Sequence, residues 1–150
     1  MENSKVYFME QALKQAYKAF LKNEVPIGAV IVKNNKIIGV GYNKRNKSKL
    51  ATRHAEIIAI EKACKKNKDW RLENCEMYVT AIPCPMCAGA IVNSRIKTVY
   101  FGATNENSEI FCNIMSNSYL NHKTNFEGGL LEKECSDILK KFFKNKRIKC

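Results

Sequence analysis

Two short stretches of this chain hold the side-chain types that metal-dependent hydrolysis requires. Cys84 and Cys87 stand three residues apart after Pro83, and His54 stands two residues before Glu56. Thiolates and a neutral imidazole suit zinc, and three protein ligands leave the fourth coordination position for water. We therefore expect His54, Cys84 and Cys87 to hold one Zn²⁺ ion. Glu56 would be the catalytic residue, because a carboxylate beside such a water can accept and return protons.

Taken separately, neither stretch is specific. A pair of thiols at this spacing also occurs as a redox dithiol or as two buried cysteines, and a histidine before a glutamate is commonly a helix-start feature. Cys150 or His122 could also close the fourth position of the metal. The combination is more informative, because both stretches are expected to begin helices that follow strand ends. Open α/β sheets bind ligands at that edge.

Hydrophobic periodicity predicts the elements that position these residues. The expected helices cover residues 6–23, 54–66, 85–93 and about 131–150, and the expected strands cover 27–32, 37–42, 76–80, 98–101 and 123–131. Between residues 103 and 121 the pattern weakens, with only a short apolar run at 110–115. Strand and helix alternate after residue 76, which favours parallel strands with helices on both faces, while the early hairpin is antiparallel. We therefore predict a mixed α/β fold and a single domain over residues 1–150.

Length and composition narrow the function further. None of the apolar runs in the 150 residues reaches the ~20 needed to span a membrane, and the first residues lack the apolar stretch of a secretion signal. We therefore expect a cytoplasmic protein with no membrane partner. The seven cysteines are odd in number and irregularly spaced, which favours reduced thiols over disulfides.

The net charge of +12 is concentrated in two segments. Residues 33–53 contain seven basic and no acidic residues, and residues 138–150, in the expected basic C-terminal helix, contain six basic and none acidic. The rest of the chain is close to neutral. Uniform lysine enrichment for solubility would not give this distribution, so it favours contact with nucleic acid over a merely solvated face.

The combination of H-x-E with P-C-x-x-C is the signature of zinc-dependent nucleobase deaminases. Beyond that signature, the chain resembles the bacterial tRNA-specific adenosine deaminases over nearly its whole length. The segments that carry this resemblance are residues 24–29, 41–43, 87–91, 94–96, 121–122, 127–131 and 134–143.

The resemblance implies a three-layer α/β/α cytidine-deaminase-like fold with a mixed five-stranded sheet, a homodimer with one Zn²⁺ per subunit, and conversion of the wobble adenosine of an arginine tRNA to inosine. Asn43 would bind the flipped base, the Ala55 backbone would help to hold it, and Glu24, Val25, Pro26 and Ile27 would line the pocket. The candidate contacts to the anticodon stem-loop are Asn105 and His122, from the resemblance, and the basic residues of the expected C-terminal helix, from the charge distribution: Lys140, Lys141, Lys144, Lys146 and Arg147. Asn43 could also be a turn residue, and Pro26 could start a strand.

The chain departs from the family pattern in two places. Ile82 stands where many relatives have glutamate, and Asn105 stands where aspartate is usual, in a shortened stretch at residues 104–109. The second departure affects the expected preference for an RNA loop. Two alternatives stay open at this point. One is a deaminase of a free nucleobase or nucleoside such as guanine or cytosine, and the other is a non-catalytic, zinc-stabilised RNA-binding module in which Glu56 caps its helix.

Overall fold

The computed structural model describes the backbone of residues 2–149 and the side chains of residues 3–146. Strands and helices alternate from residue 75 onward, as predicted for the mixed α/β fold. In chain order the elements are α1 (Glu2–Leu21), β1 (Gly28–Lys33), β2 (Lys36–Tyr42), α2 (Arg45–Ser48), α3 (Ala55–Asn67), β3 (Cys75–Ala81), α4 (Pro85–Asn93), β4 (Thr98–Ala103), α5 (Ser108–Met115), β5 (Asn125–Glu127) and α6 (Glu132–Lys149).

The five strands form one sheet in the order β2-β1-β3-β4-β5. β1 is antiparallel to both β2 and β3, whereas β3, β4 and β5 are parallel to one another, so the predicted hairpin and parallel portion are both present. Because of these directions, β2, β3 and β4 all end at the edge of the sheet where β1 begins. We call this the carboxyl edge and the other the amino edge.

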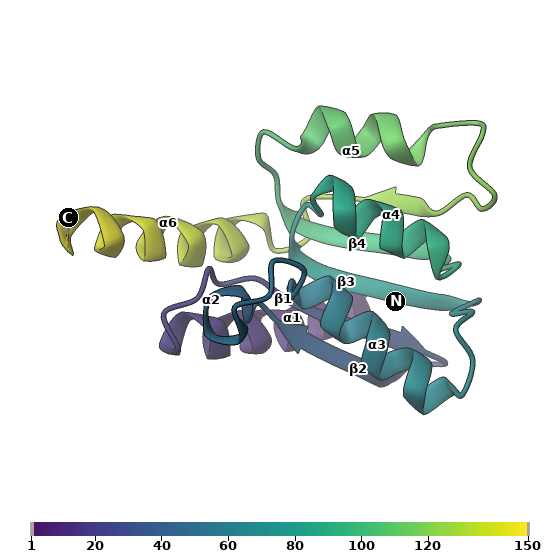
Figure 1. The fold of residues 1–150 in the computed structure, drawn as a ribbon, viewed down its shortest axis with the longest axis horizontal. Helices are drawn as coiled ribbons and strands as arrows, with labels where there is room; N and C mark the ends of the chain where they lie inside the picture. Colours follow the sequence, from purple (N-terminus) through teal and green to yellow (C-terminus); the bar gives the residue numbers. More distant parts are fainter. Residues whose placement is uncertain (1, 150) are drawn as a thin grey trace.

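Helices cover both faces of the sheet (Figure 1). Met77 and Val79 of β3 face a core shared with α3, α4 and α5, while Tyr78 between them faces a core shared with α1 and α6. This alternation is the period of two that a strand buried on both faces must have. The expected three-layer α/β/α arrangement is confirmed. Figure 1 also shows α6 extending beyond the sheet toward the C-terminus.

Two glycines of β2 let α3 lie directly on the sheet. A Cβ at Gly39 would overlap the carbonyl oxygen of Ala59, and a Cβ at Gly41 would overlap that of Ala55. Any larger side chain there would push the helix outward, so these glycines fix the height of α3 above the sheet. They thereby set where the first residues of α3 lie at the carboxyl edge.

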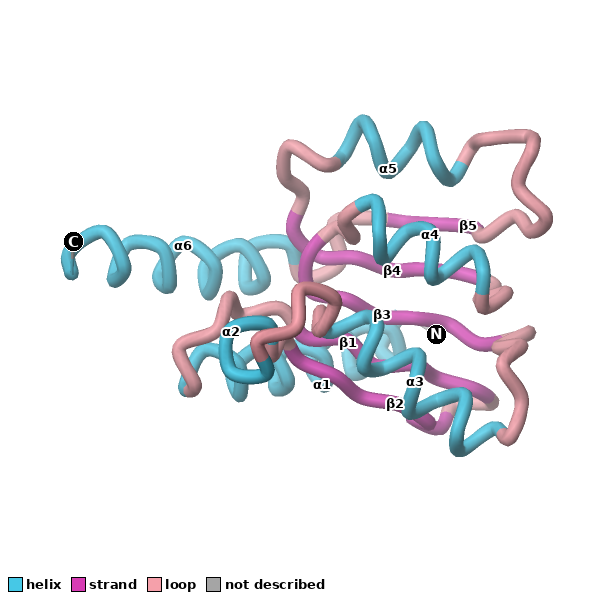
Figure 2. The backbone as a smooth tube through the Cα atoms, in the orientation of Figure 1, coloured by secondary structure: helices cyan, strands magenta, loops and turns pink. Residues whose placement is uncertain are grey.

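Three short elements differ from the sequence prediction (Figure 2). α2 interrupts a stretch expected to be loop, and α5 forms where only a short apolar run was seen. α5 buries only Phe111 and Met115, so its stability comes from packing against the body rather than from a long periodic pattern. β5 is shorter than the predicted 123–131, because Gly129 and Leu131 adopt left-handed backbone conformations that turn the chain into α6.

The described helices and cysteines test two expectations from composition, that the chain does not span a membrane and that its thiols are free. Among the described helices, none is both long and apolar enough to cross a membrane. The six described cysteines, Cys64, Cys75, Cys84, Cys87, Cys112 and Cys135, are free thiols, as the sequence predicts. Cys150 lies outside the described residues.

Candidate active site

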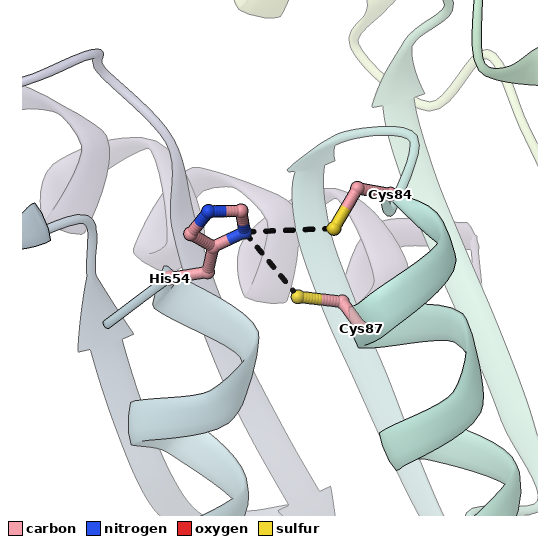
Figure 3. A group of neighbouring side chains, drawn as sticks. All are labelled: His54, Cys84 and Cys87. Carbon is pink, nitrogen blue, oxygen red and sulfur yellow. Dashed lines mark hydrogen bonds between the residues drawn. The ribbon is translucent and has the colours of Figure 1, made fainter. Parts of the chain in front are cut away.

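His54, Cys84 and Cys87 converge at the carboxyl edge of the sheet, where α3 and α4 begin side by side (Figure 3). The Nδ1 atom of His54 lies 3.6 Å from the Sγ atom of Cys84 and 3.6 Å from that of Cys87. The potential ligand atoms of the three residues all lie within 4.8 Å of one another. The fold therefore gathers an imidazole and two thiols, 30 residues apart in sequence, into a group that can hold a metal ion.

Local helix geometry explains why these side chains point toward one another. His54 and Cys84 occupy the extended N-cap positions of α3 and α4, and Pro85 takes the first position of α4, where a missing N–H costs nothing. Cys87 follows one turn later on the same face as Cys84. The positive ends of both helices thus face the group, which favours negative charge on the sulfur atoms.

The pKa values of the two thiols are shifted in opposite directions. The hydrogen bond from the Cys87 thiol, with the nearby His54 imidazole, lowers the pKa of Cys84 to about 4. The same bond and burial raise the pKa of Cys87 far above its usual range, while the hydrogen bond with Cys84 raises the pKa of His54. The pair therefore shares one negative charge, and a cation is needed to stabilise a second thiolate.

Glu56 lies in the first turn of α3 with its side chain only 4% exposed. Burial raises the pKa of Glu56 to about 7, although its own backbone N–H stabilises the carboxylate. The charge of His54 lowers the pKa of this carboxyl and that of Cys84 raises it, so the carboxylate lies close to both. A glutamate buried beside a candidate metal site has the position required of a group that transfers protons.

A cavity of about 170 Å³ opens beside the metal-binding group and the buried glutamate. Its walls are formed by Val25, Ile27, Asn43, Arg45, His54, Ala55, Glu56, Ile82, Cys84, Asn105 and Asn107. Four of the residues expected to bind substrate, namely Asn43, Ala55, Val25 and Ile27, are therefore in this wall. The wall combines apolar side chains with polar groups that converge on the same space, an arrangement that can bind and orient a base.

Asn43 joins two walls of the cavity. Its Oδ1 atom accepts a hydrogen bond from the backbone N–H of Arg45 at 3.1 Å, and its Nδ2 atom donates to the carbonyl of Val25 at 3.4 Å. The side chain is 7% exposed and keeps one amide hydrogen and one lone pair for a further partner. Asn43 is thus both a turn residue and a wall residue, so the two interpretations from sequence are compatible.

Two of the residues expected in the pocket lie behind its wall. Glu24 is 1% exposed, and its carboxylate accepts the backbone N–H groups of Asn46 at 3.0 Å and Lys47 at 2.8 Å. This pairing holds α2 against the end of α1. Pro26 is buried between Val25 and Ile27 and is not part of the cavity wall.

The residues expected to contact RNA are distributed more widely. Asn105 lines the cavity, and its side chain accepts the backbone N–H of Asn107 at 2.7 Å. His122 lies at the amino edge, where its Nε2 atom is 2.9 Å from the carbonyl oxygen of Ile96. On α6, Lys140 and Lys144 are exposed, Lys141 lies over the ring of Phe20, and Lys146 lies over that of Phe142. The side chain of Arg147 lies outside the described residues.

Sequence reasoning missed three residues of the cavity wall: Arg45, Ile82 and Asn107. Arg45 follows Asn43 by two residues, and Ile82 precedes the Pro-Cys motif, so both could have been inferred from their neighbours. Asn107 offers no such signal, because α5 itself was not predicted.

The family follows from comparison with known proteins. Residues 3–147 match the family described as MafB19-like deaminase. The chain belongs to this deaminase family. A tRNA-specific adenosine deaminase from Bacillus subtilis (strain 168) is 43% identical over 145 residues, covering 95% of this chain and 90% of that protein. Another, from Buchnera aphidicola, is 44% identical over 153 residues, covering 97% of this chain and 98% of that protein.

Solved structures agree with this assignment to the deaminases. A structure from a study of A-to-I editing by tRNA:A34 deaminases at the wobble position is 38% identical, with a TM-score of 0.84, and covers 89% of this chain and 99% of that chain. A guanine deaminase from Nitrosomonas europaea has a TM-score of 0.81 over 91% of this chain and 83% of that chain, but at 21% identity it shares only the fold. The resemblance seen in the sequence is confirmed.

Proposed function

We propose that this deaminase hydrolyses the exocyclic amine of the wobble adenosine in a tRNA anticodon loop of the arginine class, giving inosine and ammonia. The observation that carries the proposal is that Glu56 lines the same cavity as His54 and Cys84, two members of the His54–Cys84–Cys87 group. The substrate is inferred from relatives named tRNA-specific adenosine deaminase, which match this chain over about 95% of its length at 43% identity.

The separations between the His54 nitrogen and the two cysteine sulfur atoms fit zinc. Around a tetrahedral Zn²⁺ with Zn–S of about 2.3 Å and Zn–N of about 2.0 Å, sulfur and nitrogen ligands lie about 3.5 Å apart. The two separations from His54 Nδ1 are both 3.6 Å. His54, Cys84 and Cys87 would hold one zinc ion per subunit. Its chemistry there would be that of a Lewis acid that lowers the pKa of the attacking water.

The protein's own groups would carry out the proton transfers. Glu56 accepts a proton from the water as its oxygen adds to C6 of adenine, and it returns protons to the ring and to the departing amine. Asn43 binds the base edge with its remaining amide hydrogen and lone pair. The Ala55 backbone supports the base, while Val25 and Ile27 exclude bulk water. Behind this wall, Glu24 and Pro26 fix the turn that presents it.

An adenine stacked in a loop must be flipped out to enter the cavity, so the surrounding surface must hold the RNA. The end of α1 brings the two basic segments together. Phe20 packs against Phe142 of α6 at 6.2 Å between ring centroids, and Lys22 donates to the Tyr42 hydroxyl at the end of β2. We infer that Asn105 and the lysines of α6, with Arg147, contact the stem-loop.

His122 is too far from the cavity edge to contact RNA in the same way as Asn105 and α6. It lies at the edge of the sheet opposite the cavity, so it would reach RNA bound to another subunit more readily than RNA in its own cavity. We infer that the protein is a homodimer and that it acts in the cytoplasm, where tRNA is available. Sedimentation of the purified protein tests the first inference.

The decisive experiment is mass-resolved conversion of adenosine to inosine in an anticodon stem-loop with a wobble adenosine. Free adenosine, adenine, guanine and cytosine are assayed in parallel. We expect inosine in the stem-loop and no turnover of the free compounds. Turnover of a free base with an untouched stem-loop would contradict the proposal and favour a nucleobase deaminase with the same zinc and glutamate chemistry.

A charge variant separates the RNA substrate from a small molecule. Replacement of Lys140, Lys141, Lys144, Lys146 and Arg147 by glutamine should abolish turnover of the stem-loop, because the backbone phosphates lose their partners. A matched control replaces four lysines and one arginine outside both basic segments: Lys62, Lys65, Lys66, Lys68 and Arg71. The control should retain most of the activity. Equal activity in both variants would contradict the role of α6.

A further inference from the structure

A second cavity, of about 350 Å³, lies on the other side of the segment that follows β2. Its walls are formed by Lys22, Glu24, Tyr42, Lys44, Lys47 and Ser48. We propose that this cavity is a phosphate-binding site for the RNA backbone immediately beside the target nucleotide. The proposal deepens the proposed function and rests on RNA being the substrate.

The cationic groups of this cavity are held in place around one aromatic ring. Lys22 Nζ donates to the Tyr42 hydroxyl at 2.8 Å and lies 5.2 Å from the centre of its ring, while Lys44 Nζ lies 4.8 Å from the same centre. Lys22 follows α1 and Lys44 follows β2, so tertiary structure brings them together. Positioning lysines before the ligand arrives reduces the entropy lost on binding.

The cavity lacks groups that would neutralise this charge. Across the described side chains, Lys22, Lys44 and Lys47 form no ion pair. Glu24 is the single acidic residue of the wall, and its buried carboxylate is already paired with two backbone N–H groups. The hydrogen bond from Lys22 lowers the pKa of Tyr42, with further lowering by the charges of Lys44 and Lys47, as expected in a positive field. An anion is the ligand that these groups favour.

The position of the cavity relates it to the active site. Asn43 and Arg45 contribute to the wall of the first cavity, while Tyr42, Lys44 and Lys47 contribute to the second. The backbone of residues 42–47 therefore separates the two cavities. Because consecutive Cα atoms are only about 3.8 Å apart, the two cavities lie close together. A nucleotide whose base enters the first cavity has its adjoining phosphates within reach of the second. Such contacts position a strand without reading its sequence.

The surroundings favour a polynucleotide over a small free anion. Lys22 lies two residues beyond Phe20, which packs on Phe142 of α6. The second cavity therefore adjoins the candidate active site through residues 42–45 and lies near α6 through Lys22, as a continuous RNA path would require. Contacts at several points along one strand add to one another, whereas an isolated inorganic phosphate would gain only the contacts of this cavity.

The test pairs a change in the protein with a change in the RNA. Binding of the full-length protein to a labelled anticodon stem-loop is measured by fluorescence anisotropy, with a neutral methylphosphonate placed at each loop linkage in turn. For the unaltered protein, one linkage beside the target nucleotide should weaken binding about tenfold. For the Lys22→Gln/Lys44→Gln variant, binding should already be about tenfold weaker, and the same linkage should have no further effect. The variant's salt slope should fall by about 0.7 for the one lost phosphate contact.

A control variant, Lys65→Gln/Lys66→Gln, removes the same charge away from the cavity and outside both basic segments, and it should retain the full effect of the neutral linkage. Independent, additive effects at every linkage would overturn the proposal. Unchanged RNA affinity in the Lys22→Gln/Lys44→Gln variant would also overturn it. If that variant keeps its RNA affinity but loses binding to a poly-glutamate peptide or to inorganic phosphate, the cavity binds a different anion and the proposal is likewise overturned. Coupling at one linkage without any inosine formation would support the phosphate site and contradict the proposed reaction.

Discussion

The two histidines of this chain lie at opposite edges of the same sheet, and they have different surroundings. At the carboxyl edge, His54 faces two thiols at 3.6 Å and borders a cavity with a buried glutamate. At the amino edge, His122 lies 2.9 Å from the carbonyl of Ile96, which also accepts the hydroxyl of buried Thr124 at 2.8 Å. Both imidazoles are partly buried.

The difference follows from strand direction. Three strands end at the carboxyl edge, and α3 and α4 begin there with their positive ends close together, so side chains can meet around a ligand. At the amino edge, the His122 imidazole and the Thr124 hydroxyl both donate hydrogen bonds to the backbone carbonyl of Ile96. A buried carbonyl without hydrogen-bond donors would destabilise the fold. The first arrangement supports the reaction. The second stabilises the fold, so at this edge His122 could contribute to RNA contact but not to the reaction.

The largest effect should come from Glu56→Gln. Because the amide cannot accept the water's proton, turnover of the stem-loop should fall about 10³-fold, within the range for loss of a general acid–base group. The metal content should stay at one per subunit, since Glu56 is not among the ligand group. Inosine yield and elemental analysis measure the two quantities. An unchanged rate would favour the non-catalytic RNA-binding alternative.

The second effect compares the two histidines directly. His54→Ala should lower metal affinity by more than about 100-fold, since even outer-sphere partners of a ligand are worth about 10–100-fold. His122→Ala should leave metal affinity unchanged and lower thermal stability only slightly. Competition with a zinc chelator measures affinity, and a thermal melt measures stability. Equal metal loss in both variants would place His122 in the coordination sphere and contradict the comparison.

The third effect concerns the height of α3 at the carboxyl edge. Gly41→Ala would place a Cβ against the carbonyl of Ala55, so we expect unfolding to need about 1–3 kcal/mol less free energy. Metal affinity should also fall, because the first turn of α3 carries the site. Lys36→Ala, at the exposed start of the same strand, should change stability by less than about 0.5 kcal/mol. Urea titration measures the free energy of unfolding of both variants. Similar free energies for the two would show that α3 tolerates displacement.

The smallest effect should come from Thr124→Val at the amino edge. Loss of the hydroxyl removes one of two donors to the Ile96 carbonyl, which should lower the free energy of unfolding by about 1 kcal/mol. Turnover of the stem-loop should not change. Urea denaturation with a parallel activity assay tests both statements. A loss of turnover greater than the loss of folded protein would mean that the amino edge takes part in the reaction itself.

Much of the fold could be predicted because its elements carry strong local patterns. The apolar residues of β1, β3 and β4 and the periodic faces of α1 and α6 indicate buried strands and amphipathic helices without reference to the rest of the chain. α2 and α5 could not be predicted in this way. A helix of four or eight residues forms only when tertiary contacts hold it, so its own sequence contains little evidence for it.

The sequence by itself determined the ligand types, their helix-start positions and the concentration of charge in two segments, because these depend on residue identity and short spacing. Only the tertiary structure decided that His122 lies away from the two thiols, because the strands place the two histidines at opposite edges of the sheet. It also decided that Lys22 meets Tyr42 and Lys44 around a second cavity. Contacts between residues 20 or more positions apart depend on how whole helices and strands pack, so short-range sequence patterns do not predict them.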